Sequence, residues 1–281
     1  MKLGDVRESD NVQDRRGRGP VRRGAVAVSG VTIAVVLVVS VITGRNPLEL
    51  LSTIQGGGQN RRPAASTPID PKDPGAIFTR KILATTEDTW NEALPKVGKR
   101  YTMPTLVLFR DGTESACGFQ ESAVGPFYCP SDSIAYVDLD FLDDMQKKLG
   151  AQGDFAAGYV IAHEVGHHVQ NLLGLSSRVR GEGKDKGPTG NSVRIELQAD
   201  CYAGVWGAYV KKKGLLDTGD VEEALGAAAA IGDDTLQRRG KGHVTPESFS
   251  HGTSEQRVRW FRRGMESGDP NACDTLKTPG L

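Results

Sequence analysis

An uncharged run at residues 25–43, AVAVSGVTIAVVLVVSVIT, constrains the fold of this chain more than any other feature. A helix rises 1.5 Å per residue, so about 20 apolar residues span the hydrocarbon core of a bilayer. An uncharged run of this length is rarely buried inside a soluble domain. Residues 25–43 are therefore predicted to be a transmembrane segment that contacts the lipid bilayer.

The flanks of this run predict its orientation. The preceding residues 1–24 are rich in arginine, and positive charge stays in the cytoplasm. The run is longer than the apolar part of a usual signal peptide, and no A-x-A-like cleavage site follows it. We therefore expect a basic cytoplasmic N-terminus, an uncleaved single-pass signal anchor, and a folded part outside the cytoplasm.

The remaining chain divides into a linker and one domain. Residues 44–75 are mostly Gly, Pro and polar residues, which is typical of a linker, so the folded domain is predicted over 76–281. Hydrophobic spacing and turn signals predict a first helix, then short strands, then further helices. The predicted helices are 76–94, 154–173, 192–213, 220–230 and one starting at the capping box of Thr253; the predicted strands are 105–109, 115–119, 127–129 and 134–139. This order indicates an α+β fold.

The motif His-Glu-Val-Gly-His at 163–167 carries the chemistry. Helix positions four apart lie on one face, so His163 and His167 can hold one metal ion. Glu164 is rotated by about 100°, from where it can take a proton from a water polarised by the metal. A chance match in a polar helix is the alternative, but the motif lies away from the apolar stripe of its helix. Zinc is the expected metal.

A catalytic zinc site needs a third protein ligand. Glu196 and Asp200 are four residues apart on the next long helix, together with small residues that suit close helix packing. We assign Glu196 to the metal and Asp200 to a hydrogen bond with a ligand histidine. Spacing alone leaves the reverse assignment open, and a solvated acidic pair is the alternative without function.

Three further histidines are weaker candidates. His168 is rotated away from the metal face and suits packing or hydrogen bonding, and His243 lies in a Gly/Lys loop that we expect to be exposed. His251 precedes the capping box in a Gly-flanked loop. It could donate a hydrogen bond to the oxyanion of a transition state, although a structural role is an equal alternative.

The four cysteines suit an oxidising compartment. None forms a C-x2-C pair, so a cysteine zinc site is not expected. Three pairings are possible. We predict Cys117–Cys129, which would close a short hairpin-like segment, and Cys201–Cys273, which would pin the C-terminal tail to the Glu196 helix. Cys201 lies about 140° around that helix from Glu196, so it is free to bond the tail.

The motifs together resemble a known family. The stretches at 117–139, 153–174, 192–206 and 231–264 make the chain similar to the predicted neutral zinc metallopeptidases, bacterial proteins with one N-terminal membrane segment and an HExxH domain. This resemblance implies a zincin-like fold and covers nearly all of 76–275. The Glu-x-x-x-Asp of 196–200 also resembles the gluzincin arrangement, which supports Glu196 as the third ligand.

The predicted function is hydrolysis of a peptide bond in a peptide or protein substrate. The strand at 134–139 is the expected edge strand that would pair with the substrate backbone. A membrane-tethered scaffold that keeps zinc only for folding is one alternative, although such a site has no use for Glu164; an amidase acting on cell-envelope peptides is another. The zero net charge gives no indication of nucleic-acid binding.

Overall fold

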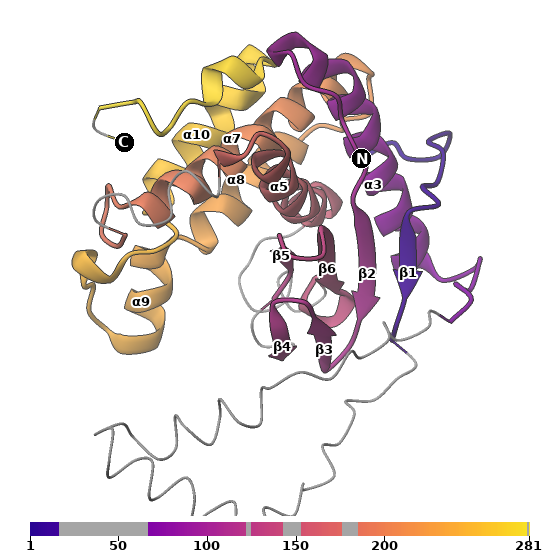
Figure 1. Ribbon diagram of the computed structural model, residues 1–281, viewed down its shortest axis with the longest axis horizontal. Coiled ribbons are helices and arrows are strands. Elements are labelled where there is room, and N and C mark those ends of the chain that lie inside the picture. The colour runs from indigo at the N-terminus through magenta and orange to yellow at the C-terminus, as the bar shows by residue number, and fades with distance from the viewer. Residues whose placement is uncertain (17–66, 122–124, 143–152, 176–184, 280) are drawn as a thin grey trace, which may run out of the picture. The chain divides into compact units, whose positions relative to one another are not determined.

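The computed structural model describes residues 1–16, 67–121, 125–142, 153–175, 185–279 and 281 (Figure 1). Its strands are β1 (Val12–Asp14), β2 (Thr105–Phe109), β3 (Gly112–Ser115), β4 (Gly118–Glu121), β5 (Phe127–Cys129) and β6 (Ile134–Asp138). Its helices are α3 (Pro74–Ala93), α5 (Asp154–Leu172), α7 (Asn191–Lys212), α8 (Asp220–Ala230), α9 (Asp233–Lys241) and α10 (Ser254–Ser267), with 3-10 turns η1 (Leu94–Val97), η3 (Pro246–Ser248) and η4 (Pro270–Cys273). A small sheet accompanied by helices is the predicted α+β class.

The predicted transmembrane segment at 25–43 lies outside the described residues. Among the helices that the structure does describe, none combines the length and the apolar character that a membrane span requires.

A four-stranded sheet with the order β1-β2-β6-β5 supports the helices. β1 and β6 run parallel to β2, whereas β5 runs antiparallel to β6. Helix α5 contacts β5 and β6 as well as α3, α7 and α8, so it lies between the sheet and the other helices (Figure 1). The sheet therefore positions the helix that carries the His-Glu-Val-Gly-His motif.

The expectation that 134–139 is an edge strand was wrong. Strand β6 is paired on both sides, with β2 in parallel and β5 in antiparallel register. The turn between β5 and β6 includes Ser133 with a positive φ of 59°, and it folds Phe127–Cys129 back onto Ile134–Tyr136. The short β5, not β6, is consequently the strand at this end of the sheet.

The N-terminal residues are part of the folded domain. Met1–Gly17 and Ser66–Leu281 form one compact unit, whereas the sequence had suggested a separate segment 1–24 and a domain beginning at 76. Strand β1 pairs with β2, and the backbone N–H of Leu106 donates to the carbonyl of Asn11 at 2.8 Å. A strand of three residues is too short for its alternation to be recognised in a sequence.

Glu87 of α3 shows how firmly this N-terminal segment is attached. Its side chain is 1% exposed. Its carboxylate accepts hydrogen bonds from Ser9 Oγ at 2.6 Å and Asn11 Nδ2 at 2.8 Å, and it forms an ion pair with Arg7 at 2.9 Å. A buried carboxylate is tolerated only with such partners, so α3 depends on residues 7–11 for the satisfaction of this charge.

Helices α7 and α10 cross at very small separation. A Cβ on Gly204 would lie 2.1 Å from the carbonyl oxygen of Phe261, and one on Gly264 would lie 1.9 Å from that of Cys201. The two glycines therefore allow backbone contact that no other residue permits. The small-residue face of 203–207 that the sequence singled out packs against α10 through this contact.

Both predicted disulfides are present. Cys117 pairs with Cys129 and Cys201 pairs with Cys273, and none of the four thiols is free. The second bond links α7 to η4 near the C-terminus. The described helices match the predicted ones closely, but α9 was not predicted, because its nine residues are mostly polar and charged.

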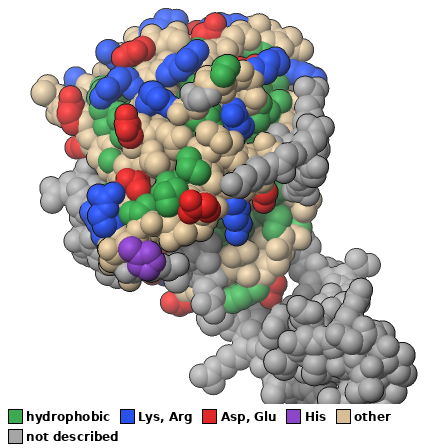
Figure 2. All heavy atoms as spheres, turned by 90° about the vertical axis from the view of Figure 1, so that its left-hand side faces the viewer, with side chains coloured by type: hydrophobic (Ala, Val, Ile, Leu, Met, Phe, Trp, Pro, Cys, Tyr) green, Lys and Arg blue, Asp and Glu red, His purple; other side chains and the backbone are tan. Residues whose placement is uncertain are grey.

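One face of the domain mixes charges of both signs. Figure 2 shows the side on which α9 and the C-terminal segment lie in Figure 1, and Lys and Arg side chains alternate there with Asp and Glu and with small hydrophobic areas. No field of a single sign covers this face.

We predict that Ser9→Ala combined with Asn11→Ala lowers the free energy of unfolding by about 1–3 kcal/mol, because the buried Glu87 carboxylate loses two donors. Urea unfolding followed by circular dichroism measures this change. Asp5→Ala, at an exposed position of the same segment, is the control and should leave stability unchanged. If the double variant were as stable as the Asp5→Ala control, the attachment of residues 7–11 to Glu87 of α3 would be contradicted.

Candidate metal centre

Helix α5 presents both histidines of the motif toward α7. The helix is almost entirely buried and ends at Leu172; Leu173 is its C-cap, and Gly174 then takes a left-handed φ of 70°. The N-cap is Gly153, and the carboxylate of Asp154 in the first turn contacts the Met1 ammonium at 2.7 Å. His163, Glu164 and His167 thus come from one rigid element in the core.

Gly166, the fourth residue of the motif, allows α7 to approach. A Cβ at this position would meet the carbonyl oxygen of Ala199 at 3.0 Å and its Cα at 3.1 Å. Such contacts are tighter than most Cβ contacts in proteins, so glycine at 166 favours the close approach of the two helices. Ala199 lies between Glu196 and Asp200 on α7, and the approach brings both carboxylates to the histidine face.

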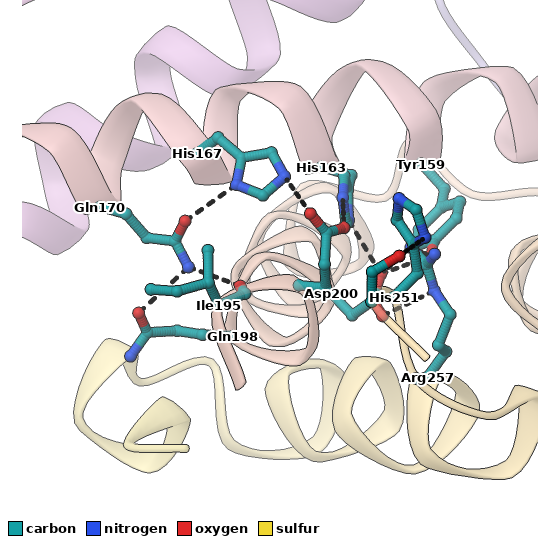
Figure 3. Close-up of polar contacts among 12 residues, drawn as sticks. Tyr159, His163, His167, Gln170, Ile195, Gln198, Asp200, His251 and Arg257 are labelled. Carbon is teal, nitrogen blue, oxygen red and sulfur yellow. Dashed lines mark hydrogen bonds and ion pairs between the residues drawn. The ribbon is translucent and has the colours of Figure 1, made fainter. Parts of the chain in front are cut away.

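The side chains of His163, His167 and Glu196 converge at this crossing, and Figure 3 labels the two histidines. Glu196 Oε2 lies 3.2 Å from His163 Nε2, and Glu196 Oε1 lies 3.5 Å from His167 Nε2. One ligand atom from each of the three residues lies within 4.8 Å of the others. Zinc bonds of about 2.0–2.1 Å in a tetrahedron place ligand atoms about 3.3 Å apart, so this donor set fits zinc.

Asp200 contacts the other side of His163. Its Oδ1 lies 2.8 Å from His163 Nδ1 and accepts a hydrogen bond from Tyr159 Oη at 2.5 Å. Arg257 of α10 donates to both carboxylate oxygens, at 2.9 and 3.0 Å. The structure therefore places Glu196 against the two Nε2 atoms and Asp200 against Nδ1 of His163.

His167 has a neutral partner instead of a carboxylate. Its Nδ1 lies 2.9 Å from Gln170 Oε1 on the next turn of α5. Gln170 is fully buried and also contacts α7 (Figure 3). Hydrogen bonds from the outer nitrogen of both imidazoles leave the Nε2 atoms directed at the common centre.

At His163 and Glu196 the neighbouring charges outweigh burial and favour the charged forms, whereas at Glu164 burial is the larger effect. Burial lowers the pKa of His163, but Asp200 and Glu196 outweigh it and raise the value to about 10. Burial raises the pKa of Glu196, yet the two histidines hold it well below its usual range. Burial raises the pKa of Glu164 above that of an exposed carboxylate, and the neighbouring histidines only partly offset this.

His251 lies in the loop between η3 and α10 and is held by Asp233. Asp233 Oδ2 accepts the backbone N–H groups of Ser250, His251 and Gly252, and its Oδ1 lies 3.2 Å from His251 Nδ1. The hydrogen bond to Asp233 raises the pKa of His251, and the charge of Glu196 adds to the increase. His251 is therefore within electrostatic reach of the centre.

The other histidines lie elsewhere. His168 is buried; its Nε2 donates to the carbonyl of Thr102 at 2.6 Å, and its Nδ1 lies 3.0 Å from Tyr128 Oη. This agrees with the packing role that the sequence suggested. His243 is exposed.

A second group of possible ligand atoms is formed by Asp154, Asp220 and Glu223. The Met1 ammonium lies against it, 2.7 Å from Asp154 and 3.4 Å from Asp220. The ammonium group therefore offsets part of the negative charge of this cluster.

Several residues of the centre were not recognised in the sequence. Tyr159 of α5 and Arg257 of α10 contact Asp200. Asp233 holds His251, and Gln170 holds His167. Gln170, three residues after His167 on one helix, had a usable signal in its i, i+3 spacing. Tyr159, four residues before His163 on the same helix, had the corresponding i, i+4 signal. Arg257 and Asp233 are distant in sequence and carry no spacing signal.

Comparisons with known proteins agree with this chemistry. A family profile described as "Putative neutral zinc metallopeptidase" matches residues 1–276. The chain is 50% identical over 283 residues to "Uncharacterized protein YpfJ" of Escherichia coli, covering 98% of this chain and 99% of that protein. It is 43% identical over 215 residues to "Uncharacterized protein Rv2575" of Mycobacterium tuberculosis, covering 72% of this chain and 71% of that protein. No solved structure matches the chain.

We expect the purified protein to hold one zinc ion per chain and to lose it when either His163 or His167 is replaced by alanine. Two of the three converging donors would remain, and a catalytic zinc site needs three. Elemental analysis after dialysis measures the content. His243→Ala, at an exposed histidine, should keep its zinc; retention by both motif variants would place the metal elsewhere.

Gly166→Ala should weaken zinc binding, because the added methyl group pushes α5 away from Ala199 and separates Glu196 from the histidines. Overpacking of this kind costs about 1–3 kcal/mol of stability as well. Gly226→Ala in α8 is the matched control, since nothing lies within 4 Å of its Cβ position. Competition with a chromogenic chelator compares the affinities; equal values for the two variants would refute the close-approach requirement.

Proposed function

The chain belongs to the family of neutral zinc metallopeptidases, and from this premise we propose that it hydrolyses peptide bonds, with zinc held by His163, His167 and Glu196. The observation that carries the proposal is the convergence of the two Nε2 atoms on one carboxylate, at 3.2 and 3.5 Å. The placement of Glu164 beside this set favours catalysis over a scaffold, because a structural metal site needs no base.

Zinc, when bound, would supply Lewis acidity toward water and toward the scissile carbonyl. Glu164 takes a proton from the attacking water as the water oxygen bonds to the carbonyl carbon, and it delivers that proton to the amine nitrogen as the C–N bond breaks. Burial suits Glu164 to both steps, because a raised pKa strengthens it as a base and brings it closer to the operating pH.

His251 is proposed as the donor to the oxyanion. It comes from outside the two helices that hold the metal, so it does not compete for the ion. Asp233 fixes its loop through three backbone hydrogen bonds and favours the protonated ring. An imidazolium donates a charge-assisted hydrogen bond, which gains strength as the carbonyl oxygen becomes negative.

A zincin-like fold is part of the proposal. The small sheet beside α5 and the antiparallel end strand β5 support it. Substrate backbone would then pair along β5 instead of β6, because β6 already has partners on both sides.

We also propose that the domain works outside the cytoplasm and is attached to the bilayer through residues 25–43. The two disulfides support an oxidising compartment. The apolar, uncharged character of 25–43 supports the attachment.

Glu164→Gln should keep zinc but abolish cleavage of a peptide library, because the amide is nearly isosteric and cannot accept a proton from water. Zinc content and product mass spectra are measured on the same preparation. Glu92→Gln, a half-exposed site on α3, is the control. Undiminished cleavage by the Glu164 variant would exclude this residue as the base.

His251→Ala should lower kcat by about 10²–10³, as for loss of one oxyanion donor, with little change in KM or zinc content. A lower melting temperature with unchanged kcat would instead identify His251 as structural.

The pH profile tests the charge of His251. The hydrogen bond with Asp233 and the charge of Glu196 raise the pKa of His251, and Arg257 opposes this increase. The stabilisation by protonated His251 is therefore complete below the ordinary pKa of 6.5 and is lost as the pH rises through the raised pKa of the folded state. Asp233→Asn should therefore move the alkaline limb of kcat to lower pH. The same substitution in a His251→Ala background should move nothing, and a shift in that background would contradict the assignment.

A further inference from the structure

Gln170 is a fully buried amide whose orientation can be deduced. Its side-chain nitrogen lies 2.7 Å from the carbonyl oxygen of Ile195, an atom that can only accept. The NH₂ group of Gln170 must therefore face Ile195, which turns its Oε1 toward His167 Nδ1 at 2.9 Å. That oxygen can only accept, so His167 carries a proton on Nδ1, and Nε2, which faces Glu196, is the ring nitrogen that a metal ion would bind.

A second glutamine extends the chain of hydrogen bonds. Gln170 Nε2 also donates to Gln198 Oε1 at 3.1 Å, and Gln198 Nε2 donates to the carbonyl of Cys273 at 2.9 Å. The carbonyl oxygen of Cys273 can only accept, so it fixes the orientation of the Gln198 amide. Cys273 is bonded to Cys201, which is on the same helix as Gln198, so a disulfide anchors the last acceptor of this hydrogen-bond series.

We propose that Gln170 and Gln198 are positioning residues that select the tautomer and ring orientation of His167, a role that rests on the proposed zinc site. The two ligand histidines are then supported differently. His163 is oriented by a carboxylate that Arg257 neutralises, and His167 by neutral amides ending at a disulfide-bonded carbonyl. Hydrogen bonds from partners of this kind typically change metal affinity 10–100-fold.

The test uses Gln170→Leu and Gln198→Leu in the full chain, with Gln237→Leu as control. Gln237 also makes two side-chain hydrogen bonds, but on α9. Two readouts are taken: the rate of zinc release to a chelator, and the visible absorption spectrum of the Co²⁺-substituted protein, which reports ligand geometry. We expect release from Gln170→Leu to be about 10–100-fold faster, a smaller increase for Gln198→Leu, and altered Co²⁺ bands in both.

Wild-type release rates and spectra in both variants would overturn the positioning role. Should Gln170→Leu fail to fold, Gln198→Leu decides, because it does not contact His167; an unchanged spectrum in that variant overturns the proposal. A wild-type protein that binds no zinc would refute the proposed function itself, so the two failures are distinguishable.

A second observation concerns membrane topology. β1 lies before the apolar run 25–43 in the sequence, and β2 lies after it, yet the two strands pair in parallel over Val12–Asp14 and Leu106–Leu108. A single crossing by 25–43 would separate these strands by the thickness of the bilayer, about 30 Å in its apolar core. The pairing and a single crossing exclude each other.

Further contacts make the N-terminal segment an integral part of the domain. Arg80 of α3 donates to the carbonyl of Ser9 at 2.9 Å and forms an ion pair with Glu8 at 2.5 Å. Arg16 bridges Asp14 and Asp73, at 2.6 and 2.5 Å. Arg16 is thus held by ion pairs within the domain instead of being free to mark a cytoplasmic side.

We infer that residues 1–16 and 67–281 lie in the same compartment, so that the chain does not cross the membrane a single time between them. This inference does not depend on catalysis. It replaces the expectation of a cytoplasmic N-terminus and a single-pass anchor.

Cysteine labelling of the full chain in intact bacterial cells tests it. Asp10→Cys probes the N-terminal segment, where the native side chain is 101% exposed, and Lys212→Cys probes the domain at a side chain that is 70% exposed. A membrane-impermeant maleimide should label both positions equally, before and after lysis. Labelling of Lys212→Cys alone in intact cells, with Asp10→Cys reacting only after lysis, overturns the inference. Labelling of both only after lysis supports a shared compartment and instead contradicts the proposed location outside the cytoplasm.

Discussion

The close contact between Gly166 and Ala199 is the constraint on which the candidate site depends. A metal centre built from two helices needs their axes close enough for a glutamate of one to reach two imidazoles of the other. A Cβ at 166 would contact the backbone of α7 at about 3 Å, which is tighter than most Cβ contacts in proteins. The glycine within the motif therefore favours the close approach that brings Glu196 to the two histidines.

The remaining polar groups hold this crossing in one geometry. Asp200 is buried and charged, and its charge is matched by Arg257 from α10. Its pKa stays low because Arg257 and His163 outweigh the effect of burial. Helix α10 is in turn held against α7 by the paired glycines 204 and 264 and near the disulfide at Cys201. The C-terminal third of the chain thus supports the charge and position of Asp200, which contacts His163.

The sequence predicted those parts whose signals are local. His163 and His167 share one face of α5, and Glu196 and Asp200 share one face of α7, so both pairs have a local spacing signal. The helix boundaries follow from hydrophobic spacing and from caps such as Thr253. The supporting residues could not be predicted in this way, since Arg257 reaches Asp200 across 57 positions. The end strand was misassigned for a different reason, because β5 has only three residues and a local turn pairs it with β6. The N-terminal strand was missed because its partner β2 lies about ninety residues later.

The most direct measurement of the central claim is X-ray absorption at the zinc K-edge of the full chain loaded with one equivalent of the metal. We predict two imidazole nitrogens, one carboxylate oxygen and one further oxygen at about 2.0–2.1 Å, with no sulfur. This shell corresponds to His163, His167, Glu196 and one position open to water or substrate. A sulfur shell at about 2.3 Å, or four protein ligands with no open position, would contradict a catalytic centre at the α5–α7 crossing.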